Sequence, residues 1–116
     1  MKTFNNILAI ETSGPICSIA LRSEKRIESA CSENENEHGL VILNFIEKLL
    51  KKSGLKKNDL DLIAISNGPG SFTGLRVANS VAQALAFAND IPLLPISSLA
   101  VLANQASIKL KKNRIF

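Results

Sequence analysis

The first third of the chain carries short apolar runs of the kind that form β-strands. Residues 7–10 are continuously apolar and are followed by turn-forming polar residues at 11–15, a pattern typical of a buried strand that ends at a turn. Apolar and polar residues alternate over 16–22 and again over 27–32, and the short polar stretch 23–25 separates them. Alternation on both sides of a short polar stretch predicts a β-hairpin.

The apolar spacing changes from two residues to three and four after residue 35, which predicts a helix over residues 35–53. Asn34 and Glu37 have the spacing of a capping pair at its start, and Gly54 is a typical helix stop. The apolar stripe of this helix is unusually broad and consists of Leu40, Val41, Leu43, Phe45, Ile46, Leu49 and Leu50. Such a stripe packs against its own sheet, and its width predicts surface left over for a partner protein.

The second half of the chain alternates strands and helices. Residues 60–65 predict a strand whose near-continuous apolarity suits a parallel strand covered on both faces. A helix rich in alanine, which permits close packing, follows over 73–88, and 91–95 predict a further short strand. Ser97 or Ser98 can cap a last helix that runs to Ala106. The order is β-β-β-α-β-α-β-α, so we predict an α/β domain with a mixed sheet and helices.

A glycine-rich loop joins the strand at 60–65 to the helix at 73–88. A Walker A loop needs a lysine after its last glycine, but Leu75 and Arg76 follow here, and the glycine spacing G-x-G-x-x-x-G differs from that of a dinucleotide loop. We therefore interpret the segment as a rigid turn, with anion binding at the helix start as the less favoured alternative. The residues of this structural loop are Gly68, Pro69, Gly70, Ser71, Thr73, Gly74 and Arg76.

Composition and charge narrow the function classes. The 116 residues, 46% of them hydrophobic, suit one small domain with its own core. The net charge of +4 comes from two groups of cations, at 48–57 and 109–114. We interpret the first group as the end of a helix and the second as a solvated tail, rather than as a nucleic-acid footprint, because the chain has no Tyr or Trp.

The N-terminus does not resemble a signal peptide, and no apolar run approaches the roughly 18 residues of a membrane span. The sequence therefore predicts a cytoplasmic protein with no membrane partner. In that compartment Cys17 and Cys31 are expected to be reduced core residues rather than a disulfide. His38 is the only histidine, so no metal site is predicted.

Residues 68–76, Gly-Pro-Gly-Ser-Phe-Thr-Gly-Leu-Arg, resemble the signature loop of the bacterial TsaB family, also called YeaZ, within the Gcp-like, actin-like ATPase superfamily. Residues 7–13 are similar to the opening strand and first turn of that family. His38 with the leucine-rich helix is similar to its first helix, and residues 96–99 are similar to the start of its third helix. The resemblance extends over residues 7–106.

This resemblance implies an RNase H-like (actin-like ATPase) single lobe. Members of the family are about twice as long, so residues 1–116 correspond to the N-terminal lobe only, and 113–116 resemble the first strand of a second lobe that this chain lacks. The implied function is that of a non-catalytic partner or scaffold subunit for a TsaD-like enzyme. Together they form the threonylcarbamoyl group on adenosine 37 of tRNAs that read A-starting codons.

The implied partners are the TsaD-like catalytic subunit, a TsaE-like ATPase and, when the chain is alone, a second copy of itself. Contact with tRNA is expected to be indirect. No cofactor is implied, although weak or shared ATP/ADP binding in the complex is left open. A nucleotide turn is implied at Glu11, Thr12 and Ser13, where the family usually has Asp in place of Glu11.

The resemblance implies no catalytic residue and no metal ligand, because Ser98 and Leu102 stand where related enzymes have a metal-binding histidine pair. A partner interface is expected on the two helices, at Leu40, Val41, Phe45, Ala78 and Ala82. Three alternatives stay open: an actin-like phosphotransferase, a Gcp-like metallopeptidase, and a purely structural dimerisation module.

Overall fold

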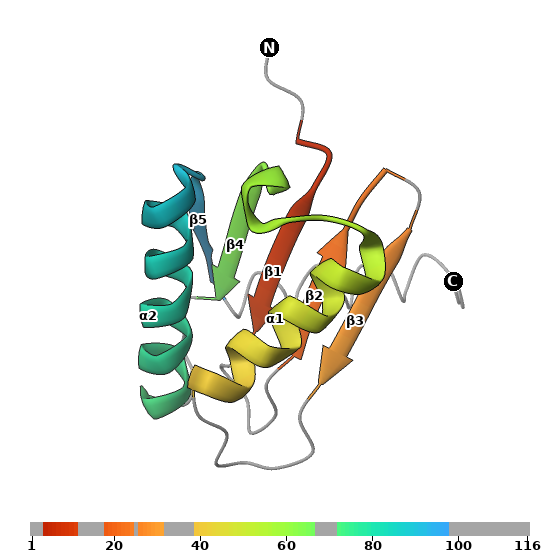
Figure 1. Ribbon diagram of the computed structural model, residues 1–116. Coiled ribbons are helices and arrows are strands. Elements are labelled where there is room, and N and C mark those ends of the chain that lie inside the picture. The colour runs from red at the N-terminus through yellow and green to blue at the C-terminus, as the bar shows by residue number, and fades with distance from the viewer. Residues whose placement is uncertain (1–3, 12–17, 25, 32–38, 67–71, 98–116) are drawn as a thin grey trace, which may run out of the picture.

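Five strands form one mixed sheet in the order β3-β2-β1-β4-β5 (Figure 1). The computed structural model describes residues 4–11, 18–24, 26–31, 39–66 and 72–97. The strands are β1 Ile7–Glu11, β2 Ser18–Arg22, β3 Ile27–Cys31, β4 Leu62–Ser66 and β5 Leu93–Ile96. The predicted hairpin is confirmed, since β2 and β3 pair antiparallel with Arg22 opposite Ile27.

The sheet divides into an antiparallel half and a parallel half. The strands β1, β2 and β3 pair antiparallel, whereas β1, β4 and β5 pair parallel. The predicted parallel strand with both faces covered is confirmed at β4, where Ile63, Ala64, Ile65 and Ser66 are all buried between β1 and β5. It begins two residues later than the apolar run suggests.

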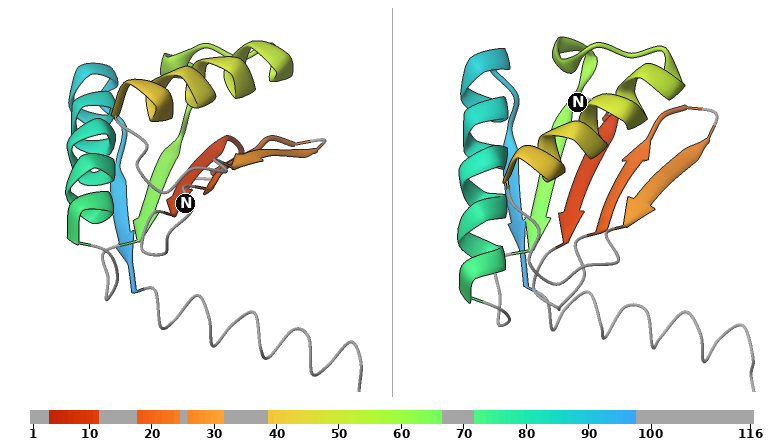
Figure 2. Two further views of the ribbon diagram at one scale, coloured as in Figure 1. Left: turned by 90° about the horizontal axis from the view of Figure 1, so that it is seen from below. Right: turned by 60° about the horizontal axis from the view of Figure 1, so that its bottom comes forward.

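Two helices cover the same face of the sheet: α1, Gly39–Ser53, and α2, Phe72–Asn89 (Figure 2). The helix α1 follows the hairpin, and α2 is the crossover between the parallel strands β4 and β5. A continuous core fills the space between helices and sheet and includes Leu8, Ile10, Ile19, Leu21, Ile42, Ile46, Ile63 and Ile65. The apolar periodicity of the sequence therefore correctly predicts the layer that holds the fold together.

Both helices end in the same hydrogen-bonding pattern. At the end of α1 the Leu55 N–H donates to the Leu50 carbonyl at 2.9 Å, and Gly54 takes a positive φ of 72°. At the end of α2 the Ile91 N–H donates to the Ala86 carbonyl at 2.9 Å. These are the hydrogen bonds of a left-handed C-cap, so the predicted stop at Gly54 is confirmed.

A short 3-10 helix, η1, Lys57–Asp59, lies between α1 and β4 and is not predicted by the sequence pattern. The Lys56 N–H donates to the Asp59 carboxylate at 2.8 Å, which closes this turn. Leu60 follows this turn and is buried, although β4 begins only at Leu62. Local side-chain capping, which apolar periodicity does not report, therefore sets the start of β4.

The expectation that Cys31 is a core residue is wrong. Cys31 ends the edge strand β3 and is exposed, with a free thiol. The inward face of β3 carries Glu28 and Ala30 instead, because the alternating pattern of this strand places Ile27 and Cys31 on the other face. Cys17 and the predicted helix ending at Ala106 lie outside the described residues.

Candidate functional site

One candidate site is the edge of the sheet where the parallel strands β1 and β4 end. Glu11 is the last residue of β1 and is half-buried, and Ser66 is the last residue of β4 and is buried. The pairing of Ile10 with Ile65 places these two ends side by side. In open α/β sheets ligands bind at the carboxyl ends of the strands, so this edge is where a nucleotide turn belongs.

Most of the residues predicted to complete this edge lie outside the described residues: Thr12, Ser13, Gly68, Pro69, Gly70 and Ser71. Thr73 and Gly74 belong to the first turn of α2, and Arg76 follows them as an exposed residue on the same helix. Its carbonyl accepts a hydrogen bond from the Ser80 hydroxyl at 3.0 Å. The glycine-rich loop thus joins a strand end to a helix start, and its structural role stays a prediction.

Within the described part of the chain, no group of three or more His, Cys, Asp or Glu side chains is arranged to hold a metal ion. The polar side chains that the described residues place at this edge are the half-buried carboxylate of Glu11 and the buried hydroxyl of Ser66.

The second candidate site is the surface of the two helices, and here the sequence-based assignment needs correction. Ala78 and Ala82 have exposed fractions of 0% because they face the core of this chain, so they offer no surface to a partner. Phe45 is partly buried and packs against the same core. Leu40 and Val41 belong to α1, but their side chains lie outside the described residues.

The outward face of α2 carries an exposed row that sequence reasoning missed. Phe87 has an exposed fraction of 92%. Four small or polar residues near it on the helix, Ser80, Gln83, Ala84 and Ala88, are also exposed. We call Ser80, Gln83, Ala84, Phe87 and Ala88 the α2 stripe. A helical projection identifies it, because Phe87 falls outside the buried row of Ala78, Ala82 and Leu85.

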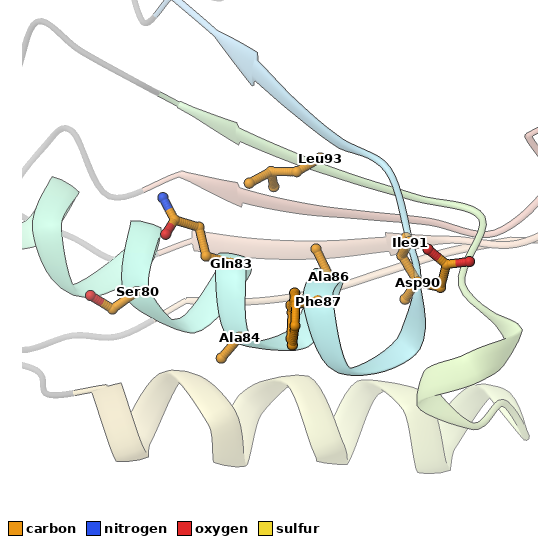
Figure 3. A pocket seen from close by; sticks show the side chains of 8 residues that line it. All are labelled: Ser80, Gln83, Ala84, Ala86, Phe87, Asp90, Ile91 and Leu93. Atoms are coloured by element: carbon orange, nitrogen blue, oxygen red, sulfur yellow. The ribbon is translucent and has the colours of Figure 1, made fainter.

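An open depression of ≈ 870 Å³ lies along this helix (Figure 3). It is lined by Ser80, Gln83, Ala84, Ala86, Phe87, Asp90, Ile91 and Leu93. Leu94 on the neighbouring strand β5 is 46% exposed and adds apolar surface at the edge of the sheet. A small-molecule site encloses most of its ligand, so an open depression beside an exposed aromatic residue suits a protein contact better.

Comparisons with known proteins identify the family. Residues 31–115 match the family model described as "TsaD: tRNA N6-adenosine threonylcarbamoyltransferase". The chain belongs to this family. Among its relatives, the "tRNA threonylcarbamoyladenosine biosynthesis protein TsaB" of Buchnera aphidicola subsp. Schizaphis graminum is 41% identical over 94% of this chain and 52% of its own length. The protein of the same name from Haemophilus influenzae is 43% identical over 86% of this chain and 42% of its own.

The fold agrees with the TsaB (YeaZ) members of the family. The solved structure "YeaZ from Pseudomonas aeruginosa" has a TM-score of 0.82 at 40% identity and covers 88% of this chain and 48% of its own. The predicted RNase H-like, actin-like lobe is therefore confirmed. The chain spans about half the length of the curated TsaB relatives it matches. Within its described residues, neither helix has the length and apolarity of a membrane span.

Proposed function

We propose that this chain is a non-catalytic partner subunit in the formation of threonylcarbamoyladenosine on tRNA, and that a TsaD-type subunit carries out the transfer. The name of its TsaB relatives refers to biosynthesis of the modified nucleoside, whereas the family description names the transferase. Similarity to both the TsaB proteins and the transferase family fits a subunit that has the same kind of lobe as the enzyme and docks on the enzyme. A TsaE-like ATPase is the further expected partner, in the cytoplasm.

The exposed α2 stripe is the observation that carries this proposal. Phe87 is 92% exposed, whereas Val81 and Leu85 on the same helix are buried, so its ring is left for contact with another molecule. Its small neighbours Ala84 and Ala88 allow a second helix to approach closely. An exposed aromatic ring among small side chains has the composition of an interface anchor.

Nucleotide binding is proposed only as a weak or shared property of the complex. Glu11 and Ser66 lie side by side at the sheet edge where actin-like proteins would contact phosphate. Because clefts of this kind form between two surfaces, a second lobe or a partner would supply the other wall. The isolated chain should therefore bind ATP or ADP weakly.

Replacing Phe87 with Asp tests the partner surface. Phe and Asp have similar helix propensities and Phe87 is exposed, so the F87D variant should lose only about 1 kcal/mol of stability, mainly because its carboxylate lies in the last turn of α2. Its affinity for a TsaD-type subunit, measured by isothermal titration calorimetry, should fall by about 30-fold or more, as expected for an aromatic anchor.

Ile27→Asp is the matched control, because Ile27 is also apolar and 70% exposed but lies on the edge strand β3 at the other end of the sheet. This variant should keep wild-type affinity. If F87D binds the TsaD-type subunit as tightly as the I27D control does, the α2 stripe is not the docking surface.

A further inference from the structure

The last turns of α1 and the segments packed around them form a basic face. We define the basic face as Arg26, Lys48, Lys51, Lys52, Lys56 and Lys57. Lys48, Lys51 and Lys52 lie on one side of the helix, because residues three and four apart are neighbours on a helix surface. The six cations come from three separate segments, so the fold gathers more charge here than the helix end alone carries.

Ion pairs join these segments into one surface. The Glu28 carboxylate of β3 lies 3.2 Å from the Lys52 ammonium of α1. The same carboxylate lies 3.4 Å from the Arg26 guanidinium of the hairpin. The Lys57 ammonium lies 3.2 Å from the Glu47 carboxylate of α1. Among the described residues, Glu28 and Glu47 are the two carboxylates that form ion pairs with cations of the basic face.

The nearby aspartates Asp59 and Asp61 accept backbone N–H groups and form no ion pair with the described lysines. The Asp59 carboxylate accepts the Lys56 backbone N–H, and the Asp61 carboxylate accepts the backbone N–H groups of Asn5 and Asn6. Lys48, Lys51 and Lys56 are exposed and form no ion pair with the described residues. Three solvated ammonium groups are therefore free to bind an anionic ligand.

The composition of the basic face identifies the class of ligand. Lysine is depleted in protein–protein interfaces, and the outward side of α1 here is polar, with Asn44 and Glu47 between the lysines. The lysine ammonium binds phosphate as a point charge and lacks the planar, bidentate hydrogen-bonding geometry of arginine. None of the six described residues that define the face is aromatic, so they offer no ring on which a base could stack. These properties suit the phosphate backbone of a nucleic acid and contact without sequence readout.

We infer that the basic face contacts the phosphate backbone of the tRNA substrate directly. This inference rests on the proposed function, which makes tRNA the nucleic acid present in the complex. It revises the expectation that these lysines only end a helix and that tRNA contact is indirect. The helix α1 begins beside α2 and ends over β3, so the part of the face on α1 and the hairpin lies away from α2, whereas Lys56 and Lys57 belong to the turn η1, which contacts α2 (Figure 1, Figure 2). Through the lysines of α1, the chain can therefore hold tRNA while α2 contacts a protein partner.

The test is fluorescence anisotropy of a labelled, unmodified tRNA transcript titrated with the full 116-residue chain at several salt concentrations. Three phosphate contacts should weaken binding by roughly 20- to 40-fold between about 50 and 200 mM salt, over and above any contribution from other cations. The K48Q/K51Q/K56Q variant should lose that part of the salt dependence and bind more weakly at low salt. Wild-type protein that does not bind the transcript at about 50 mM salt overturns the inference.

The matched control is R22E/S29E, which lowers the net charge by the same three units at exposed positions of β2 and β3, outside both the basic face and the α2 stripe. It should keep most of the tRNA affinity. Equal loss in the two variants means that overall charge, not the basic face, determines binding, and the inference fails. Tighter binding of the wild type to poly-glutamate than to tRNA likewise overturns it, since the ligand is then an acidic polypeptide.

Binding of the TsaD-type subunit separates this inference from the proposed function. The triple lysine variant should bind that subunit as the wild type does while losing tRNA, whereas F87D should lose the subunit and keep tRNA. If F87D keeps the subunit, the proposed docking surface fails and the tRNA result stands. If the lysine variant loses the subunit but keeps tRNA, the basic face belongs to the protein interface and the inference is wrong.

Discussion

A single carboxylate joins the N-terminal residues to the loop that leads into β4. The Asp61 Oδ2 accepts the backbone N–H groups of Asn5 at 3.0 Å and Asn6 at 2.9 Å. The Asp61 N–H donates in turn to the Asn6 carbonyl at 2.8 Å. Because β1 and β4 are neighbours in the sheet, these bonds align the starts of two adjacent parallel strands.

We expect Asp61→Ala to lower the free energy of unfolding by about 1–2 kcal/mol, since it removes two charge-assisted hydrogen bonds and leaves a partly buried N–H without its acceptor. Urea denaturation measures this as a lower midpoint with an unchanged slope. Asp61→Asn keeps an acceptor oxygen and should lose less. An alanine variant as stable as the wild type would show that water replaces the carboxylate.

At the residue scale, the sequence pattern predicts which residues share a face of a strand better than it predicts whether that face is turned to the core or to solvent. Ile19 and Leu21 share a face in the alternating pattern and are both buried. Cys31 follows the same kind of alternation, but it lies on an edge strand whose outward face meets solvent. Which side of a strand faces the core depends on its place in the sheet, and that place is a tertiary property.

Among the elements, the two helix ends offer a natural comparison. Both place one residue in the left-handed region, Gly54 at φ 72° after α1 and Asp90 at φ 53° after α2. Glycine enters this region at no steric cost, whereas a residue with a Cβ is strained there. The hydrogen-bond pattern is the same at both ends, so the residue type is the main difference between them.

Gly54→Ala should therefore destabilise the domain by about 1 kcal/mol through the backbone alone, because a Cβ at this position meets no atom within 4 Å. Gly54→Asn is the control and should cost less, since Asn tolerates positive φ. Thermal unfolding followed by circular dichroism measures both. A G54A variant with wild-type stability would mean that the chain leaves α1 in another way.

The reverse change at the end of α2 should be favourable. Asp90→Gly removes the left-handed strain but adds flexibility to the unfolded chain, so we expect a net gain of about 0.5 kcal/mol. The same thermal unfolding measurement applies. A loss of stability instead would indicate that the Asp90 side chain contributes more to the helix end than its backbone strain costs.

Helix periodicity predicts the existence of α1 and α2 and their buried rows, but not which small residues face outward. Ala78 and Ala82 permit close packing in either direction, and the structure directs them into the core of this chain. Ala84 and Ala88 on the same helix are exposed. An alanine contributes little to an apolar stripe, so the larger residues around it decide which face is buried, and here Phe87 is the exception.

For the molecule as a whole, the sequence predicts the order of the strands and helices. It does not predict which residues come together on the surface. Strand and helix patterns give the β-β-β-α-β-α-β order, and parallel strands such as β1 and β4 need helical crossovers. The basic face depends on ion pairs between residues far apart in the chain, such as Lys52 with Glu28. No local pattern brings those residues together.

The last prediction concerns what the chain does without its partner. A surface that fits a related lobe should also fit a copy of itself, so we expect the isolated chain to form a two-fold homodimer in which the α2 stripes meet. The stripe is small, with Phe87 as its one large apolar residue. Because interfaces below about 1,200 Å² are weak, the dimer should dissociate on dilution.

Analytical ultracentrifugation over a range of concentrations measures this equilibrium. F87D should remain monomeric where the wild type and I27D dimerise, because the Asp carboxylates would face each other across the two-fold axis. Addition of a TsaD-type subunit should convert the homodimer into a heterodimer, since both assemblies use one surface. A complex that contains the TsaD-type subunit and an intact homodimer would show instead that this chain docks through a different face.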